Sequence, residues 1–238
     1  ACRTVFPGVP HVRDPGRLRP VRVYHRIVMR IFLGVTGASG AIYGARCLAV
    51  LTAAGHHVGV CVSNAGARVI SHELLREGPR PASYRDVAER FVARHADPAG
   101  AVELLDPEDI ACAFASGSSG ARAALIAPCS TSTLGHIATG TGANLIHRVA
   151  EVMLKERGRL VVIPRETPVS LIQLRNMTTI TEAGGIVLPA SPGMYAMPES
   201  IDDLIDFVVG KALDVLGVDH SLFPRWGQQD AAPAGTHR

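Results

Sequence analysis

A glycine-rich turn near the start of the chain has the composition of a phosphate-binding loop. It reads Gly34-Val-Thr-Gly-Ala-Ser-Gly40 and stands between an apolar segment and a helical pattern, so its backbone amides and the helix N-terminus can face an anion. The turn lacks the Lys-Ser/Thr pair of a P-loop and departs from the GxGxxG dinucleotide pattern. Ser63, and not an acidic residue, follows the second apolar segment. A mononucleotide such as FMN therefore fits better than NAD, although such turns also occur as plain tight turns.

A hydroxyl-rich turn, Pro128-Cys-Ser-Thr-Ser-Thr133, follows a further apolar segment. Its hydroxyls and free amides suit the phosphate or ribityl chain of a flavin. Both this turn and Ser63 can equally begin a helix, since a serine hydroxyl caps the first amides of a helix. The two explanations remain open for both positions.

Charged residues stand close to predicted strand ends or on predicted helices. Arg165 and Glu166 come directly after a buried segment, where an arginine can neutralise a phosphate or flavin charge and a carboxylate can exchange a proton. Arg148, Lys155 and Glu73 fall on predicted helices. For each of these three, taken singly, exposure to solvent is the ordinary explanation.

The elements that must position these residues predict the fold. Apolar segments of strand length alternate with amphipathic helical patterns, which indicates a Rossmann-like, three-layer α/β fold with a mostly parallel sheet. In such a sheet the carboxyl ends of the strands meet at one edge, so the turns that follow them are expected to converge there. The predicted strands cover residues 31–35, 58–62, 123–127, 160–163 and 186–188.

The helix boundaries follow from capping residues and glycines. Predicted helices cover residues 41–54, 63–75, 144–157 and 200–216, and two more follow residues 133 and 167. Residues 78–110 show no clear pattern. We expect Thr167-Pro168 and Ser200 with Asp203 to begin helices, and Gly55, Gly158 and Gly184-Gly185 to end them.

The composition fits one α/β domain with a sizeable core, because 47% of the 238 residues are apolar and 19% are charged. A net charge of +3 is too small for a nucleic-acid binder, and small molecules are the expected partners. We expect residues 1–29 to form a loose N-terminal extension, residues 30–227 the folded domain, and residues 228–238 a polar C-terminal tail.

The five cysteines are odd in number, widely spaced and without a CxxC pair, which predicts reduced thiols and no metal site. No apolar run approaches the roughly 20 residues that cross a bilayer, and the start lacks the apolar core of a signal peptide. A cytoplasmic location without membrane association is therefore expected.

Several segments together resemble the UbiX family of flavin prenyltransferases, which includes phenylacrylic acid decarboxylase-like flavoproteins. The resemblance covers roughly residues 30–227, and LKERxxLVxxPRE is particularly distinctive. It implies a flavodoxin-like or HFCD-like flavoprotein fold. The segments that carry it are GVTGASGAIYG at 34–44, ASGS at 115–118, APCSTSTLGHIATG at 127–140, NLIHRVAEVMLKERGRLVVIPRETP at 144–168, LPASPGMYAMPESIDDLIDFVVGK at 188–211 and LFPRWG at 222–227.

The resemblance implies a role for each matching position. Contacts to FMN fall on Gly37, Ala38, Ser39, Ser63, Ser130, Thr131, Ser132, Thr133 and Arg165. Contacts to dimethylallyl phosphate fall on Ser116, Gly117, Ser118, Arg148, Lys155, Tyr195 and Lys211. Ser39, Glu73 and Glu166 match residues implicated in the chemistry, in which Arg148 and Lys155 stabilise the leaving phosphate.

The implied reaction joins a dimethylallyl group to N5 and C6 of reduced FMN, without a metal. The product would serve a UbiD-type decarboxylase, and relatives assemble as dodecamers with the flavin site between subunits. Position 211 is Lys where Arg is the family pattern, and an ammonium cannot make the bidentate fork of a guanidinium. This departure puts in question how well the protein uses dimethylallyl phosphate as the donor.

Two other functions remain as alternatives. One is an FMN-dependent decarboxylase of a cysteine-containing peptide or of pantothenoyl-cysteine, which has a similar fold. The other is a non-catalytic, flavin-binding subunit of a hydroxyarylic acid decarboxylase, an alternative that the departure at Lys211 keeps open. The KERxxLVxxPRE and PGMY segments favour prenyl transfer.

Overall fold

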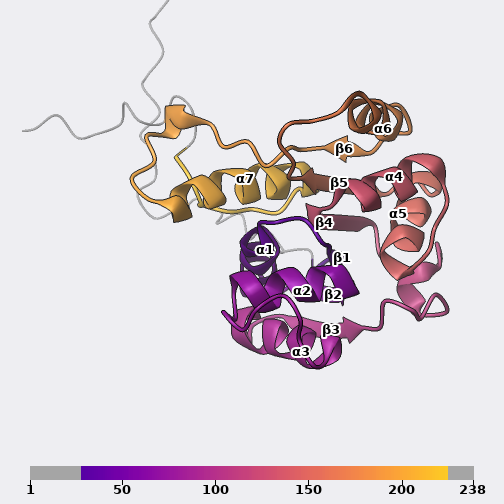
Figure 1. Cartoon of the computed structure of the whole chain (residues 1–238), viewed down its shortest axis with the longest axis horizontal. Coiled ribbons are helices and arrows are strands. Elements are labelled where there is room, and N and C mark those ends of the chain that lie inside the picture. The colour runs from indigo at the N-terminus through magenta and orange to yellow at the C-terminus, as the bar shows by residue number, and fades with distance from the viewer. Residues whose placement is uncertain (1–27, 225–238) are drawn as a thin grey trace, which may run out of the picture.

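The computed structural model describes residues 28–224. The predicted N-terminal extension lies outside the described residues apart from its last two positions, and the predicted C-terminal tail lies outside them entirely. Within residues 28–224 the chain forms one six-stranded sheet with helices on both faces (Figure 1).

The sheet has the strand order β3-β2-β1-β4-β5-β6, and all of its pairings are parallel. The strand order reverses between β1 and β4, and in open α/β sheets ligands bind beyond the carboxyl ends of the strands at such a point. The predicted Rossmann-like fold is confirmed. The strands are β1 Arg30–Val35, β2 His57–Val62, β3 Ala101–Leu105, β4 Ala123–Cys129, β5 Arg159–Pro164 and β6 Ile186–Val187.

Helices form the two outer layers. Buried residues of α1, α2, α3 and α7 pack on one face of the sheet, and buried residues of α4, α5 and α6 pack on the other. The helices are α1 Ala41–Ala53, α2 Asn64–Glu73, α3 Tyr84–His95, α4 Thr131–Thr139, α5 Leu145–Lys155, α6 Leu171–Glu182 and α7 Ile201–Leu216, with short 3₁₀ turns η1 at Ala113–Ala115 and η2 at Met194–Ala196.

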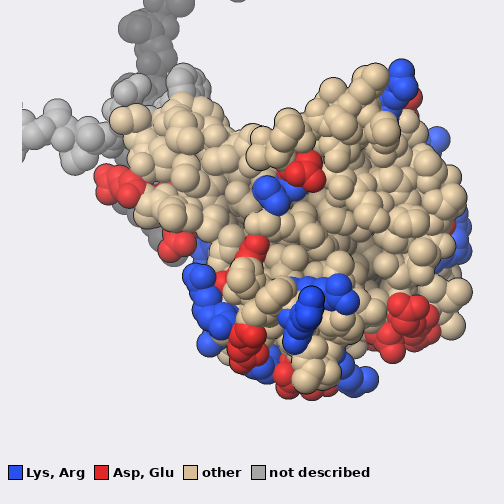
Figure 2. All heavy atoms as spheres, in the orientation of Figure 1, with Lys and Arg blue, Asp and Glu red and all other residues tan. Residues whose placement is uncertain are grey.

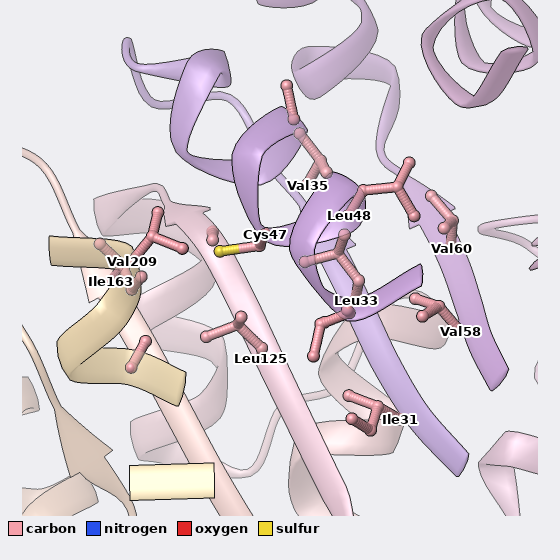
Figure 3. Packing of buried hydrophobic residues seen from close by; sticks show 14 of the residues in the cluster. Ile31, Leu33, Val35, Cys47, Leu48, Val58, Val60, Leu125, Ile163 and Val209 are labelled. Carbon is pink, nitrogen blue, oxygen red and sulfur yellow. The ribbon is translucent and has the colours of Figure 1, made fainter. Parts of the chain in front are cut away.

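Alternation along the strands divides the apolar side chains between two cores. In β1, Leu33 belongs to the core under α1 and α7, whereas its neighbour Phe32 belongs to the core under α4 and α5. Figure 3 shows Leu48 of α1 and Val209 of α7 above the strands in the first core. Both faces of the strands are covered, which explains the nearly continuous apolar runs in the sequence.

The unassigned residues 78–110 contain α3 and β3. Strand β3 lies at the sheet edge, where only Leu105 of its five residues is buried. Helix α3 buries Val87, Ala88 and Phe91 and is otherwise largely polar. Because both elements bury so little, their sequences lack the strong periodicity of the central elements.

The prediction that Thr167-Pro168 begins a helix is wrong. Helix α6 begins at Leu171, where the side chains and backbone amides of Ser170 and Gln173 form a reciprocal capping box. This arrangement satisfies two helix-end amides at once, which a single threonine cap cannot do.

The end of α5 also differs from the expectation. The helix ends at Lys155, and Arg157, not Gly158, adopts the left-handed conformation, with φ at 57°. Gly158 serves close packing instead, since an added Cβ would lie 2.8 Å from the sulfur of Met153. The predicted caps at Ser63 and at Ser200 with Asp203 are confirmed, and Gly55 and Gly184 have positive φ just past their helices.

The cysteines in the described part of the chain are unpaired. Three of them, Cys47, Cys61 and Cys129, are buried, and Cys112 is half-buried. No helix within residues 28–224 is long and apolar enough to span a bilayer.

Candidate functional site

Two of the predicted ligand-binding turns lie side by side beyond the carboxyl ends of β1 and β4. Their link is the side chain of Thr36, which is 1% exposed. Its hydroxyl donates to the carbonyl oxygen of Pro128 at 2.8 Å and accepts from the amide of Ser130 at 2.7 Å. The amide of Thr36 donates to the same Pro128 carbonyl at 3.2 Å.

The glycine-rich turn presents free backbone donors. Among the described residues, the amides of Gly37, Ala38 and Ser39 have no protein acceptor, and Ser39 is exposed. Gly37 is required by close packing, because an added Cβ would lie 2.6 Å from the Cβ of Ala65 at the start of α2. Three consecutive open amides at a helix N-terminus suit a phosphate or another anionic group.

Glu73 holds the start of α1. Its Oε2 accepts hydrogen bonds from the amides of Gly40 and Ala41, both at 2.9 Å. The carboxylate comes from the last residue of α2, so it ties the two helices together behind the glycine-rich turn. A negative charge at this end of a helix is also favoured by the helix dipole.

Arg165 reaches the glycine-rich turn from the end of β5. Its Nε donates to the carbonyl oxygen of Ser39 at 3.1 Å. The half-buried phenol of Tyr43 lies close to the guanidinium: burial raises the pKa of Tyr43, and Arg165 acts in the opposite direction. The structure thus brings together the predicted flavin contacts from β1 and β5.

The two serines left open between capping and binding are both helix caps. Ser63 Oγ accepts from the amide of Gly66 at 3.0 Å, and Ser130 Oγ accepts from the amide of Thr133 at 3.2 Å. Capping leaves the amides of Thr131 and Ser132 without a protein acceptor among the described residues. A second set of open amides therefore stands beside those of the glycine-rich turn.

Glu166 follows Arg165 at the same edge and is exposed. One of its oxygens accepts from the amide of Thr167 at 3.0 Å. Because the residue is exposed, its carboxylate is accessible to a bound ligand.

A second group of predicted residues lies at the opposite edge of the sheet. Helix α5 runs from beside Pro107, beyond the carboxyl end of β3, to the start of β5. Lys155 therefore lies near the amino edge and pairs with Glu156 at 2.6 Å. The Ser116–Ser118 segment is its neighbour, since an added Cβ on Gly117 would meet the Glu156 carboxylate. A strand of six residues spans roughly 20 Å, so one chain does not bring this group to the glycine-rich turn.

Arg148 lies on the first half of α5 and pairs with Glu151 at 3.6 Å. Its side chain is 43% exposed. Because α5 begins beyond the carboxyl end of β3, Arg148 lies toward the edge that carries the flavin turns, whereas Lys155 lies at the opposite end of the helix.

Tyr195 and Lys211 belong to the C-terminal part of the fold. The ring of Tyr195 in η2 packs edge-on against Phe207 of α7, with centroids 5.4 Å apart. Lys211 is exposed one helical turn after Phe207. The segment that carries Tyr195 leaves the sheet edge at Ala190, whose amide donates to the carbonyl oxygen of Pro164.

Two cavities of the described residues are separate from the open amides. One of about 760 Å³ lies at the amino edge and contains Arg122 and Arg159. One of about 560 Å³ lies beyond β2 and β3, where Asp106, Glu108 and Asp109 would repel a phosphate. Within residues 28–224 no three His, Cys, Asp or Glu side chains are grouped to hold a metal ion.

Sequence reasoning missed Thr36 and Tyr43 as site residues. A threonine between an apolar strand and a glycine gives no sign of burial, and Tyr43 reads as part of the apolar face of α1. One feature could have indicated both residues: they follow the end of β1 by no more than eight positions, close to the glycine-rich turn.

Comparison with known proteins agrees with this geometry. The flavoprotein family model matches residues 24–213. The flavin prenyltransferase UbiX of Halalkalibacterium halodurans is 45% identical over 197 residues, which is 83% of this chain and 93% of that protein.

Solved structures give the same result. A UbiX protein, AnUbiX (PadA1), in complex with FMN and dimethylallyl pyrophosphate, is 36% identical with a TM-score of 0.71, covering 84% of this chain and 97% of that one. A dodecameric FMN-dependent UbiX-like decarboxylase from Escherichia coli O157:H7 is 35% identical with a TM-score of 0.70, covering 83% and 98%. The chain therefore belongs to the flavoprotein family and, within it, to the UbiX flavin prenyltransferases.

Proposed function

We propose that this protein transfers a dimethylallyl group from dimethylallyl phosphate to N5 and C6 of reduced FMN. The observation that carries the proposal is the pair of open amide turns at the carboxyl edge, joined by Thr36 and held by Arg165. The reduced flavin supplies the nucleophilic atoms. The protein supplies the binding groups, the charge that balances phosphate, and a proton acceptor.

The open amides and Arg165 have the right chemistry for FMN. Amides of Gly37 to Ser39 and of Thr131 and Ser132 can bind phosphate or ribityl oxygens. Arg165 is already oriented on the Ser39 carbonyl, so its remaining N–H groups can bind a flavin oxygen without a large rearrangement. Glu166, exposed at the same edge, is the candidate to accept the proton lost from C6.

Cationic residues would stabilise the phosphate as it leaves. We assign this role to Arg148, Lys155 and Lys211, with Tyr195 and the Ser116–Ser118 segment helping to hold the donor. Lys155 and the Ser116–Ser118 segment lie at the opposite sheet edge of the same chain, so we infer that a second copy of the chain supplies them to the flavin site.

A homo-oligomer is supported by exposed apolar side chains. On α6, Leu171 and Ile172 are 61% and 70% exposed, and Met197 after η2 is 77% exposed. Figure 2 shows that the visible surface over α6 is mainly uncharged, whereas charges of both signs gather around α2 and α3. Apolar surface of this kind is typical of protein interfaces. We propose a dodecamer, the assembly named for the similar Escherichia coli protein.

Mixed oligomers test the shared site. Arg165→Ala and Lys155→Ala should each abolish most product formation. Co-assembly of the two variants should restore part of the activity, because some sites then receive both intact residues from different chains. Failure of every mixture to recover activity, with oligomer formation verified by light scattering, would contradict a shared site.

The product is proposed to pass to a UbiD-type decarboxylase, since prenylated FMN is useful only to an enzyme that binds it. A cytoplasmic location is proposed on the basis of the unpaired cysteines. Both statements depend on the prenyl transfer itself.

Anaerobic incubation with reduced FMN and dimethylallyl phosphate tests the reaction directly. We expect the flavin to gain the mass of one C5 unit and its absorption spectrum to change, without added metal. Turnover of a cysteinyl substrate with no change in flavin mass would favour the decarboxylase alternative. Tight FMN binding with no covalent product, under full reduction, would favour a non-catalytic flavin-binding subunit.

A further inference from the structure

We propose that Thr36 is a positioning residue that fixes the spacing between the two turns that bind FMN. The inference rests on the proposed function and adds a residue to its site. Thr36 immediately precedes the first turn, and its hydroxyl bonds to Pro128 and Ser130, which frame the start of the second.

The hydroxyl of Thr36 joins the turns in both directions. A hydroxyl has one donor and two acceptor sites, and here it donates to the Pro128 carbonyl and accepts the Ser130 amide. The side chain is 1% exposed, so water cannot readily replace either bond. The strands β1 and β4 are paired only as far as Gly34 and Ile126. Beyond that point, three hydrogen bonds of Thr36, two from its hydroxyl and one from its amide, connect the segment after β1 to Pro128 and Ser130.

This geometry makes flavin affinity depend on a residue that need not touch flavin. One FMN molecule must meet the amides of Gly37 to Ser39 and those of Thr131 and Ser132 at the same time. If the two sets shift relative to each other, a ligand aligned with one set loses bonds to the other. Removal of the hydroxyl should therefore weaken FMN binding beyond its effect on folding.

Thr36→Val is the informative variant, because valine keeps the branched shape and loses both hydrogen bonds. We expect the Kd for FMN to rise about tenfold, as for loss of one buried hydrogen bond. The Kd is measured by quenching of flavin fluorescence in the absence of dimethylallyl phosphate. Thr36→Ser keeps the hydroxyl and should bind FMN within about twofold of the wild type. In prenyl transfer the loss should appear in the KM for FMN, with kcat largely retained.

Thr52→Val is a matched control. Thr52 is fully buried, donates to the Leu48 carbonyl at 2.7 Å and accepts from the Asp97 amide at 2.8 Å. It joins the far end of α1 to the segment before β3, away from the two turns. Thr52→Val should lower the melting temperature about as much as Thr36→Val and leave FMN affinity unchanged.

Four results would overturn the proposal: a Kd within twofold of the wild type for Thr36→Val, an equal loss in Thr52→Val, an equal loss in Thr36→Ser, or wild-type protein that does not bind FMN. Should Thr36→Val fail to fold, Thr36→Ala replaces it, and equal FMN affinity of the Ala and Ser variants would reject the role. If the wild type binds FMN but forms no prenylated product, the proposed function fails while the affinity comparison still decides the role of Thr36.

Discussion

Replacement of Glu73 tests how the glycine-rich turn is held in place. The carboxylate accepts two amides at the start of α1, those of Gly40 and Ala41. Glu73→Ala removes both bonds, at a cost of about 0.5 to 2 kcal/mol for a lost helix cap, and a charge that contributes about 0.3 to 1 kcal/mol near a helix N-terminus. We expect its free energy of unfolding to fall by about 2 kcal/mol. Glu73→Gln keeps an acceptor oxygen and loses only the charge, so we expect a fall of about 0.5 to 1 kcal/mol.

Urea denaturation of the two variants measures these changes, with the slope of the transition as a check on two-state unfolding. Thermal melting should show decreases of about 4 to 8 °C for Glu73→Ala and about 1 to 4 °C for Glu73→Gln. Glu77→Ala is the control, because Glu77 is exposed and pairs with Arg90 on the surface. It should lower stability by less than about 1 kcal/mol.

Enzyme assays then separate an anchoring role from a chemical one. If Glu73 anchors the turn, Glu73→Gln should form product at a rate within about fivefold of the wild type, and Glu73→Ala should bind FMN about tenfold more weakly. If Glu73 exchanges a proton, glutamine cannot replace it. Loss of product in Glu73→Gln at full FMN occupancy, equal to the loss in Glu73→Ala, would refute the anchoring role.

Three further changes test the charges. Glu166→Gln should keep FMN affinity and slow product formation at least about tenfold, because it removes a proton acceptor without removing bulk; unchanged single-turnover rates would exclude that role. Lys211→Arg should preserve or lower the KM for dimethylallyl phosphate, and a large rise would show a pocket adapted to lysine. Burial, with a smaller effect of His136, lowers the pKa of His147 from 6.5 to about 4. The folded state therefore favours the neutral form, whereas the unfolded chain binds a proton below about pH 6.5. The free energy of unfolding should fall by about 1 to 3 kcal/mol as the pH drops from 6.5 toward 4. The Nδ1 of His147 accepts a hydrogen bond from the Ala143 amide at 3.2 Å. His147→Gln keeps an acceptor for this amide and should lose less stability over that range in urea titrations, and an equal loss would contradict the assignment.

The central elements of the fold could be predicted because their local signals agree with their packing. Strands β1, β4 and β5 are covered on both faces, so nearly every position in them must be apolar. The resulting apolar runs predict these strands. Helix α7 begins at a capping box that is visible as Ser200 with Asp203. The signal fails where burial is slight, as in β3, and where two caps compete, as at Thr167 and Ser170. In those places the choice depends on contacts that are distant in the sequence.

The binding turns could be predicted for a topological reason. Residues that follow parallel strands must emerge at one edge, whatever the lengths of the intervening helices, and so Ser39 and Arg165 meet although 126 positions separate them. The topology of the sheet does not impose the contact between Glu73 and Gly40. This contact requires that α2 run for a particular length and end at a particular rotation, which no local pattern of residues specifies.

Lys155 shows a further limit of prediction from sequence. A single sequence does not show whether two site residues act within one chain or come from two copies of it. The resemblance places Lys155 and Ser39 in one reaction, while the course of α5 puts them at opposite edges of a sheet roughly 20 Å across. No rotamer of a lysine side chain spans that distance, so the two assignments are compatible only if they describe different copies of the chain. The apolar surface of α6 and the separation of these two residues both support the proposed assembly, in which one chain supplies Ser39 to a site and a neighbouring copy supplies Lys155.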